Sequence, residues 1–127
     1  MLYELTFLEA QINPTGDLEG ATSRTQDIRL KTYFHKNGKS VGVTNGWFIS
    51  PISEGSQEFF YWKMGGTKGF NTFIAFEKNN QTAVVILANS QQSVEEIGFG
   101  LIKVLQMEQL DWAGVEGAIG EKNQLLK

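Results

Sequence analysis

Lys63, Gly65 and Thr67 have the types and the spacing to bind a ligand, because they alternate along a segment that is rich in β-forming residues. A lysine ammonium can bind a carboxylate, and a glycine lets a ligand approach the backbone closely. A strand of this kind can also shape an oxyanion site, where backbone groups stabilise developing negative charge. The nucleophile of such a reaction must come from elsewhere, so we expect the segment to be one wall of a site.

Few other side chains are candidates for catalysis. The chain has no cysteine, which excludes a disulfide, a thiolate nucleophile and a cysteine metal site. Its one histidine, His35, lies in the polar sequence HKNGK, and we interpret it as a solvated turn residue rather than a catalytic base. A single histidine with no acidic cluster of ligand spacing also predicts no metal site. We expect no cofactor.

The composition is that of one ordinary soluble domain. The 127 residues are 41% hydrophobic and 20% charged, with a net charge of -3. The 11 Lys and Arg are scattered among 14 Asp and Glu, which argues against nucleic-acid binding. The N-terminus lacks the pattern of a secretory signal, and the longest apolar run, Ala83–Ala88, is far shorter than the roughly 20 residues of a membrane helix. As written, the sequence predicts a cytoplasmic protein without a membrane span.

The first third of the chain is predicted to contain two short helices. The first is indicated by apolar residues at helical spacing, and Pro14 with Gly16 ends it; these residues are Leu2, Leu5, Leu8 and Ile12. A second short helix is expected to begin at Asp17, with irregular chain after it as far as Phe34.

The middle of the chain is predicted to be β-structure. The expected strands are Val41–Ile49, Glu58–Met64, Phe70–Glu77 and Thr82–Ala88. The short connection 78–81 suits a hairpin, so the order predicts an antiparallel meander of three to four strands in an α+β fold. The last strand does not alternate polar and apolar residues, which indicates that both of its faces are covered.

A C-terminal helix is expected to cover one of those faces. Ser93 and Glu96 have the spacing of a capping box, and an apolar stripe follows, formed by Val94, Ile97, Leu101, Val104 and Leu105. The other face is left to the N-terminal helix, to the region from Asp17 to Phe34, or to another chain. We divide the chain into a domain, 1–107, and a glycine-containing extension, 108–127, which Trp112, Val115 and Ile119 could dock.

The ligand-binding segment resembles the third active-site element of class C β-lactamases and of the related penicillin-binding proteins and esterases. Their pattern is Lys or His followed by x-G-x-T-x-G-F, and the sequence from Tyr61 to Phe70 is YWKMGGTKGF. The hairpin and the C-terminal helix of that family are similar to FIAFEKNNQTAVVILANS and VEEIGFGLIKVL, and upstream elements are similar to LTFLEAQINP and VGVTNGWFI. The resemblance covers residues 2 to about 106, in the family's order.

The resemblance implies a serine hydrolase fold that is only partly represented, roughly its last third. It also implies that Lys63 supports the substrate carboxylate or the proton network and that Gly65 lets the ligand approach the backbone. Thr67 and Gly69 match the pattern, Lys68 stands where Gly or Pro is common, and Met64 replaces a threonine whose hydroxyl contacts the β-lactam carboxylate. The change at Met64 favours the broader esterase-like relatives.

The family's nucleophile is the serine of an S-x-x-K motif, aided by a Y-x-N element. Neither motif occurs in this sequence. Three interpretations follow: a hydrolase part that another chain must complete, a non-catalytic binding or assembly module, or a truncated gene product without a function of its own. We also expect self-association, through edge pairing or an exchanged helix, if part of the sheet is uncovered.

Overall fold

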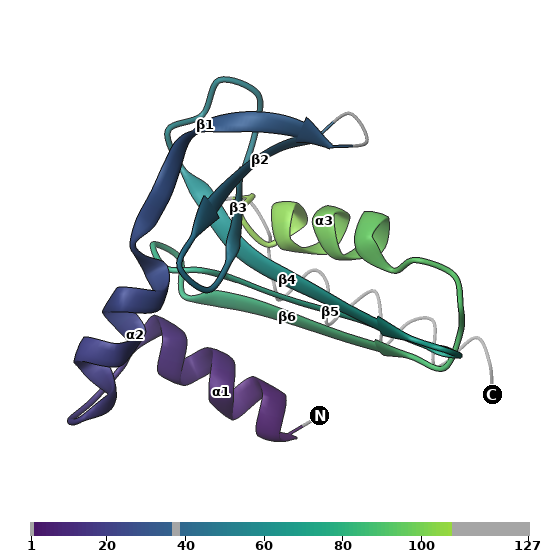
Figure 1. Ribbon diagram of the computed structural model, residues 1–127, viewed down its shortest axis with the longest axis horizontal. Helices are drawn as coiled ribbons and strands as arrows, with labels where there is room; N and C mark the ends of the chain where they lie inside the picture. The colour runs from purple at the N-terminus through teal and green to yellow at the C-terminus, as the bar shows by residue number, and fades with distance from the viewer. Residues whose placement is uncertain (1, 37–38, 108–127) are drawn as a thin grey trace, which may run out of the picture.

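The computed structural model describes residues 2–36 and 39–107, which form a six-stranded sheet with three helices packed against it (Figure 1). The elements along the chain are α1 (Leu2–Ile12), α2 (Leu18–Gln26), β1 (Ile28–Lys36), β2 (Lys39–Thr44), β3 (Phe48–Pro51), β4 (Phe59–Thr67), β5 (Phe70–Glu77), β6 (Thr82–Ala88) and α3 (Glu95–Val104). The expected α+β class is confirmed. Each strand pairs antiparallel with the next, in the order β1-β2-β3-β4-β5-β6, so the meander is confirmed with more strands than expected.

The additional strands come from two errors of prediction. The region before Phe34 is not irregular, because β1 pairs with β2 as far as Lys36 and Lys39. His35 therefore lies in a strand, opposite Ser40, and not in a turn. Register shifts interrupt this pairing twice, so the alternation of apolar and polar residues that marks a strand is weak in the sequence of β1. The pairing with β2 therefore decides its conformation.

The expected strand from Val41 to Ile49 is divided in two. Asn45-Gly46 makes a turn after β2, and the Thr44 hydroxyl accepts a hydrogen bond of 2.8 Å from the Trp47 backbone N–H across it. Gly46 packs so closely on α2 that a Cβ atom there would lie 3.0 Å from the Thr25 Cβ. The Asn-Gly pair was the signal for this turn.

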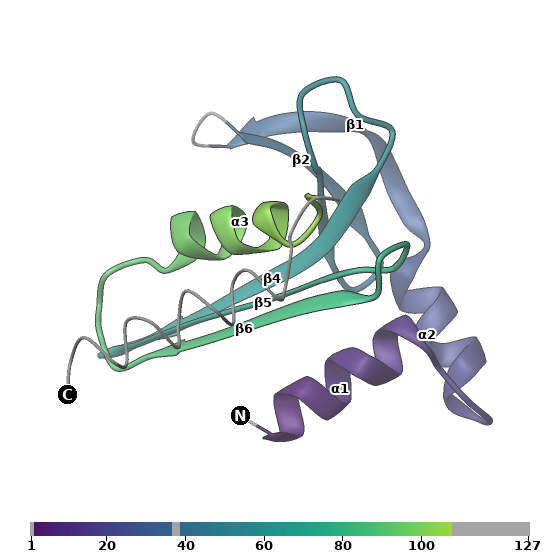
Figure 2. The same ribbon diagram turned by 180° about the vertical axis from the view of Figure 1, so that it is seen from behind.

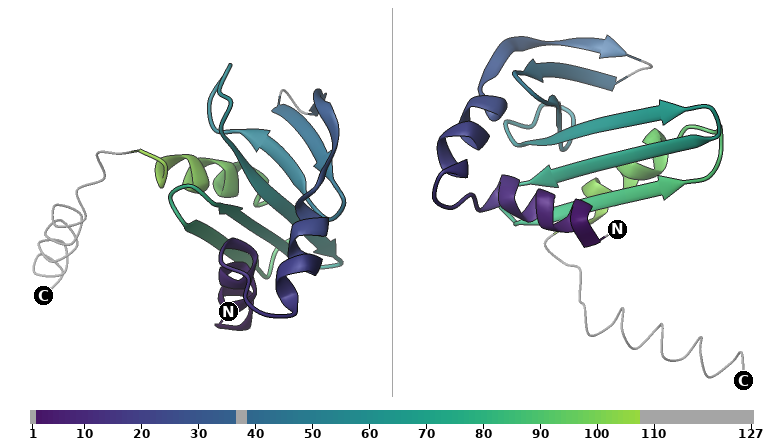
Figure 3. Two further views of the ribbon diagram at one scale, coloured as in Figure 1. Left: turned by 90° about the vertical axis from the view of Figure 1, so that its left-hand side faces the viewer. Right: turned by 60° about the horizontal axis from the view of Figure 1, so that its bottom comes forward.

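The sheet lies between two helices, as the views in Figures 1 and 2 and the left view of Figure 3 show: α3 covers one face and α1 the other. The core on the α3 side is formed mainly by Phe60, Trp62, Phe73, Val84, Phe99 and Ile102. The core on the α1 side is formed by Leu8, Ile12, Trp47, Ile49, Tyr61 and Phe76. β6 contributes side chains to both cores, which confirms that both of its faces are covered and shows that α1 supplies the second cover.

The predicted apolar stripe of α3 is correct only in part, because Val94 is buried and Leu105 packs against the core, while Ile97, Leu101 and Val104 are exposed. The buried residues of the helix are Glu95, Gly98, Phe99 and Ile102, whereas Ile97 and Leu101 are 58% and 45% exposed. Gly98 explains the difference, because a Cβ at this position would lie 2.3 Å from the Phe73 ring; only the glycine face can approach the sheet so closely. The helix also begins at Glu95 rather than Ser93, whose hydroxyl accepts the Glu95 N–H at 3.3 Å.

The N-terminal helices are confirmed, with a narrower buried stripe in α1 than the spacing predicted. Leu8 and Ile12 are buried, while Leu2 and Leu5 are exposed. α2 begins after Asp17 as expected. The extension 108–127 and its three docking residues lie outside the described residues.

Candidate functional site at the open segment of β4

β4 changes character at its middle. Phe60, Tyr61 and Trp62 are buried, and every residue from Lys63 to Thr67 is exposed. The change coincides with the end of β3, which pairs with β4 only as far as Phe48 and Trp62, while β5 continues along β4 to Thr67. We call residues 63–67 the open segment of β4, and Figure 1 shows this end of the β4–β5 hairpin extending past β1–β3.

The open segment presents unpaired backbone groups along one edge. Thr67 and Phe70 flank a two-residue turn and pair directly, so they exchange both of their hydrogen bonds. Alternation then directs the backbone groups of Gly65 and Lys63 towards β5 as well. The N–H and C=O groups of Met64 and Gly66 point the other way, to the edge that no other described strand pairs with. This edge can receive hydrogen bonds from an extended ligand or strand.

Three of the residues identified from the sequence share one face. Lys63, Gly65 and Thr67 face the α1 side, as Tyr61 does, and Met64 faces the α3 side. The Lys63 ammonium lies 4.9 Å from the centroid of the Phe48 ring, which packs against the core on the α3 side, so the lysine side chain reaches across the open edge at the point where β3 begins. Alternation therefore places the first three residues on one face of the strand and Met64 on the other.

A groove with a volume of about 340 Å³ runs along this face. Lys63, Met64 and Gly65 of the motif line it and Thr67 does not; the other lining residues are Glu4 of α1, Thr72, Ile74 and Leu87. The Thr72 hydroxyl donates a 3.3 Å hydrogen bond to the Gly65 carbonyl, and a Cβ at Gly65 would lie 2.9 Å from that hydroxyl. A cation beside an apolar floor can hold a carboxylate ligand that carries an apolar group.

Gly69 has a different role from the other residues of the motif. It lies in the turn after β4 with a φ of 94°, a conformation that residues with side chains rarely adopt. The turn therefore explains why a glycine is required at this position. Gly69 stands at the end of the hairpin and does not line the groove.

Several serines have structural partners that account for them. The buried Ser50 hydroxyl accepts a 3.0 Å hydrogen bond from the Trp62 indole N–H, which fixes the ring in the core. The hydroxyls of Ser56, Ser90 and Ser93 accept backbone N–H groups in turns and at the start of α3. None of these four hydroxyls has the lysine of an S-x-x-K motif beside it in the sequence.

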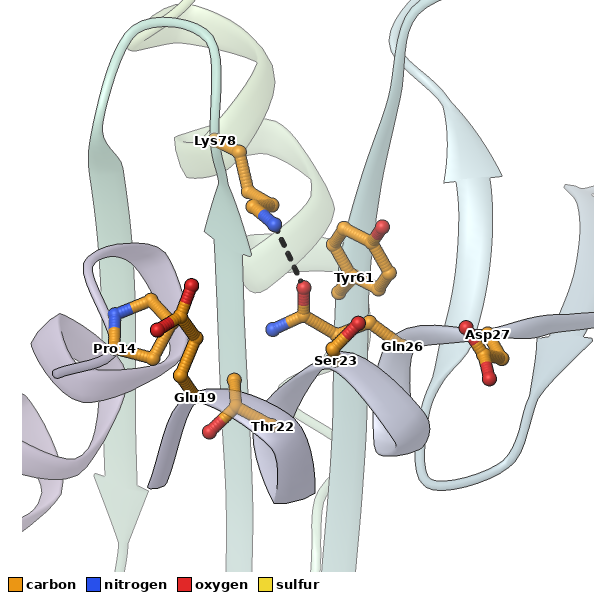
Figure 4. A pocket seen from close by; sticks show the side chains of 8 residues that line it. All are labelled: Pro14, Glu19, Thr22, Ser23, Gln26, Asp27, Tyr61 and Lys78. Carbon is orange, nitrogen blue, oxygen red and sulfur yellow. Dashed lines mark hydrogen bonds between the residues drawn. The ribbon is translucent and has the colours of Figure 1, made fainter. Parts of the chain in front are cut away.

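A second cavity, which the sequence did not predict, lies where α2 meets the sheet (Figure 4). It is lined by Pro14, Glu19, Thr22, Ser23, Gln26, Asp27, Tyr61 and Lys78, and its volume is also about 340 Å³. Burial raises the pKa of the Tyr61 hydroxyl above its ordinary value. These residues come from four separate segments and form no motif, so only the fold brings them together.

The described residues include no group of three or more His, Asp and Glu side chains that could hold a metal ion. No helix within 2–36 and 39–107 has the length and apolar character needed to cross a bilayer. Comparison of the chain with protein-family models, with curated proteins and with solved structures found no match.

Proposed function

We propose that this chain supplies the ligand-binding strand of a β-lactamase-like serine hydrolase and that it has no hydrolytic activity by itself. The observation that carries the proposal is the open segment of β4, where Lys63, Gly65 and Thr67 share one face beside an unpaired edge. The nucleophile would come from a segment outside these 127 residues, because S-x-x-K is absent from them.

The geometry supports binding of an extended carboxylate. The outward backbone groups of Met64 and Gly66 can exchange hydrogen bonds with a ligand amide, and the Lys63 ammonium can pair with a carboxylate. Each hydrogen bond to a charged group contributes about 1.5–3 kcal/mol. Within the described residues, the ammonium forms a cation–π interaction with Phe48, which a carboxylate could displace.

The position of Met64 supports the broader esterase-like substrate class. Met64 lines the groove together with Lys63 and Gly65. A thioether at this position offers no hydroxyl to a β-lactam carboxylate. Ligand recognition would then rest on Lys63 and on the backbone.

Equilibrium dialysis with radiolabelled benzylpenicillin, which carries one carboxylate and one acylamide, tests this proposal. We expect reversible binding, with no label retained after denaturation and no turnover of a chromogenic cephalosporin. Lys63→Ala should weaken binding about tenfold, whereas the control Lys68→Ala, in the adjacent turn, should leave it unchanged. Stoichiometric label on a serine would overturn the proposed lack of a nucleophile, and absence of binding would overturn the ligand-binding role.

A second candidate function, an assembly module, is favoured by the same open edge. A second copy placed antiparallel and centred on Gly65 would bring Lys63 opposite Thr67 and Met64 opposite Gly66 of the partner. Each long side chain would meet a small residue. The five residues of the open segment are enough for such a pair, and the pairing cannot extend further because β3 already pairs with the next residue, Trp62.

Disulfide trapping separates this candidate from the first, since the chain has no native cysteine. A mixture of the Lys63→Cys and Thr67→Cys variants should form a disulfide heterodimer under mild oxidation, because cross-strand neighbours lie within disulfide reach. Each variant alone should form much less dimer. Equal cross-linking in the mixture and in the separate variants would rule out this register.

A further inference from the structure

We propose that the cavity between α2 and the sheet binds a small zwitterion, a free α-amino acid. The assignment is independent of the proposed function, because it rests on residues that lie outside the open segment of β4. Within the described residues, the side chains of opposite charge that line the cavity do not pair with each other, and the hydroxyl of Tyr61 also lines it.

The size of the cavity suits a ligand of this class. Its volume of about 340 Å³ corresponds to roughly eleven water-sized groups. A free amino acid has a similar number of non-hydrogen atoms or fewer. The lining is mainly polar, so a polar ligand is favoured over an apolar one.

Tyr61 presents a polar group to the cavity. The residue is only 8% exposed, and its hydroxyl forms no hydrogen bond with the described part of the chain. The ring is fixed by stacking on Phe76, with the ring centroids 4.7 Å apart. The hydroxyl can be reached from the cavity, so a molecule bound there could form a hydrogen bond with it.

Lys78 is held at the cavity by a hydrogen-bonded chain, shown in part in Figure 4. Its ammonium donates a 2.9 Å hydrogen bond to the Gln26 side-chain carbonyl. The buried Gln26 amide donates in turn to the Gln11 backbone carbonyl at 2.8 Å, which fixes the orientation of the amide group. The ammonium keeps two further N–H donors, and a carboxylate can accept both.

Glu19 and Asp27 supply the opposite charge. Both line the cavity, and neither forms an ion pair with Lys78 or with another side chain of the described residues. A simple anion would be repelled by the two carboxylates, and a simple cation would be repelled by Lys78. Glu19 and Asp27 lie on opposite sides of the cavity in Figure 4, so a ligand whose carboxylate pairs with Lys78 would place its ammonium at one of these two carboxylates.

An NMR titration of the full chain with L-serine tests the proposal. We expect saturable shifts in the backbone amides of Gln26, Tyr61 and Lys78, with no shift in the open segment of β4. N-acetyl-L-serine lacks the ammonium and L-serine methyl ester lacks the carboxylate, so each should bind at least tenfold more weakly. Equal shifts with all three compounds, or no saturable shift at these amides with L-serine, would overturn the assignment.

Three variants assign the contacts. Lys78→Met and the double variant Glu19→Gln/Asp27→Asn should each weaken L-serine binding about tenfold, which corresponds to about 1.4 kcal/mol. All three positions are exposed, so the substitutions should preserve the fold, which the dispersion of the amide spectrum checks directly. Tyr61→Phe removes only the hydroxyl and should weaken binding as well. The matched control is Lys68→Met; unchanged binding in the other variants would show that the cavity is not the site.

Discussion

The two halves of β4 differ in burial and in strand pairing. Phe60 to Trp62 are buried between β3 and β5 and form part of both cores, whereas Lys63 to Thr67 are exposed and pair with β5 alone. The difference arises from the length of β3, because four residues of that strand cover only one end of β4. One strand thus serves the core at one end and presents a backbone edge at the other.

The largest effect should come from Trp62→Ala in the covered half. Trp62 is completely buried, and its indole donates a hydrogen bond to Ser50. Truncation of a buried aromatic residue lowers the free energy of unfolding by about 3–5 kcal/mol. Met64→Ala, two residues along on the same face, is the control and should cost less than about 1 kcal/mol. Similar losses for both variants, measured by urea unfolding, would remove the distinction between the halves.

A smaller effect is expected where α3 covers the buried half. Gly98→Ala places a methyl group against the Phe73 ring and should lower the free energy of unfolding by about 1–3 kcal/mol. Gly100→Ala is the matched control, since no atom lies within 4 Å of a Cβ there and alanine favours a helix by about 0.5–1 kcal/mol. Thermal unfolding should therefore shift in opposite directions for the two variants.

In the open half, Lys63→Ala should change binding more than stability. Loss of the contact with Phe48 should lower the free energy of unfolding by about 0.5–1 kcal/mol, as for an exposed cation–π pair. The accompanying tenfold loss of benzylpenicillin binding would assign the residue to ligand recognition. A loss of several kcal/mol in stability would instead make Lys63 a core residue in effect.

The smallest effect is expected in the pH dependence of stability, through Tyr61 in the buried half of β4. Burial raises the Tyr61 pKa above 10.0, so the folded protein holds this proton to higher pH than the unfolded chain does. The resulting contribution to stability is complete below pH 10 and is lost as the pH rises towards the pKa of the folded state. Tyr61→Phe should flatten the decline in stability between pH 9 and 11. An identical decline in both proteins would contradict the assignment.

The sequence predicted the fold class better than the boundaries of the individual helices and strands. The apolar run of β6 and the hairpin after Glu77 had strong local signals, and the α+β meander follows from them. β1 was missed because its pairing with β2 is irregular. The buried face of α3 was assigned partly wrongly because the close packing of Gly98 on Phe73 is a tertiary contact that the local sequence does not reveal. Helical periodicity alone favours the stripe with the larger apolar side chains as the buried face of the helix.

The candidate site was also predicted only in part, because some of its features have a local sequence pattern and others depend on the fold. Alternation along β4 places Lys63, Gly65 and Thr67 on one face, and a strand pattern contains that information. The open edge depends on where β3 begins, at Phe48 after the turn at Asn45-Gly46, and on its pairing with β4. The polar cavity has no local signal at all, because Gln26 and Lys78 are 52 residues apart.

The most direct measurement of the central claim is a map of backbone amide shifts along β4 during titration with benzylpenicillin. The account predicts saturable shifts at Lys63 to Thr67, strongest at the outward N–H groups of Met64 and Gly66, with little change from Phe59 to Trp62. Shifts confined to the covered half, or spread evenly along the strand, would contradict the claim that the open segment is the ligand-binding part of the molecule.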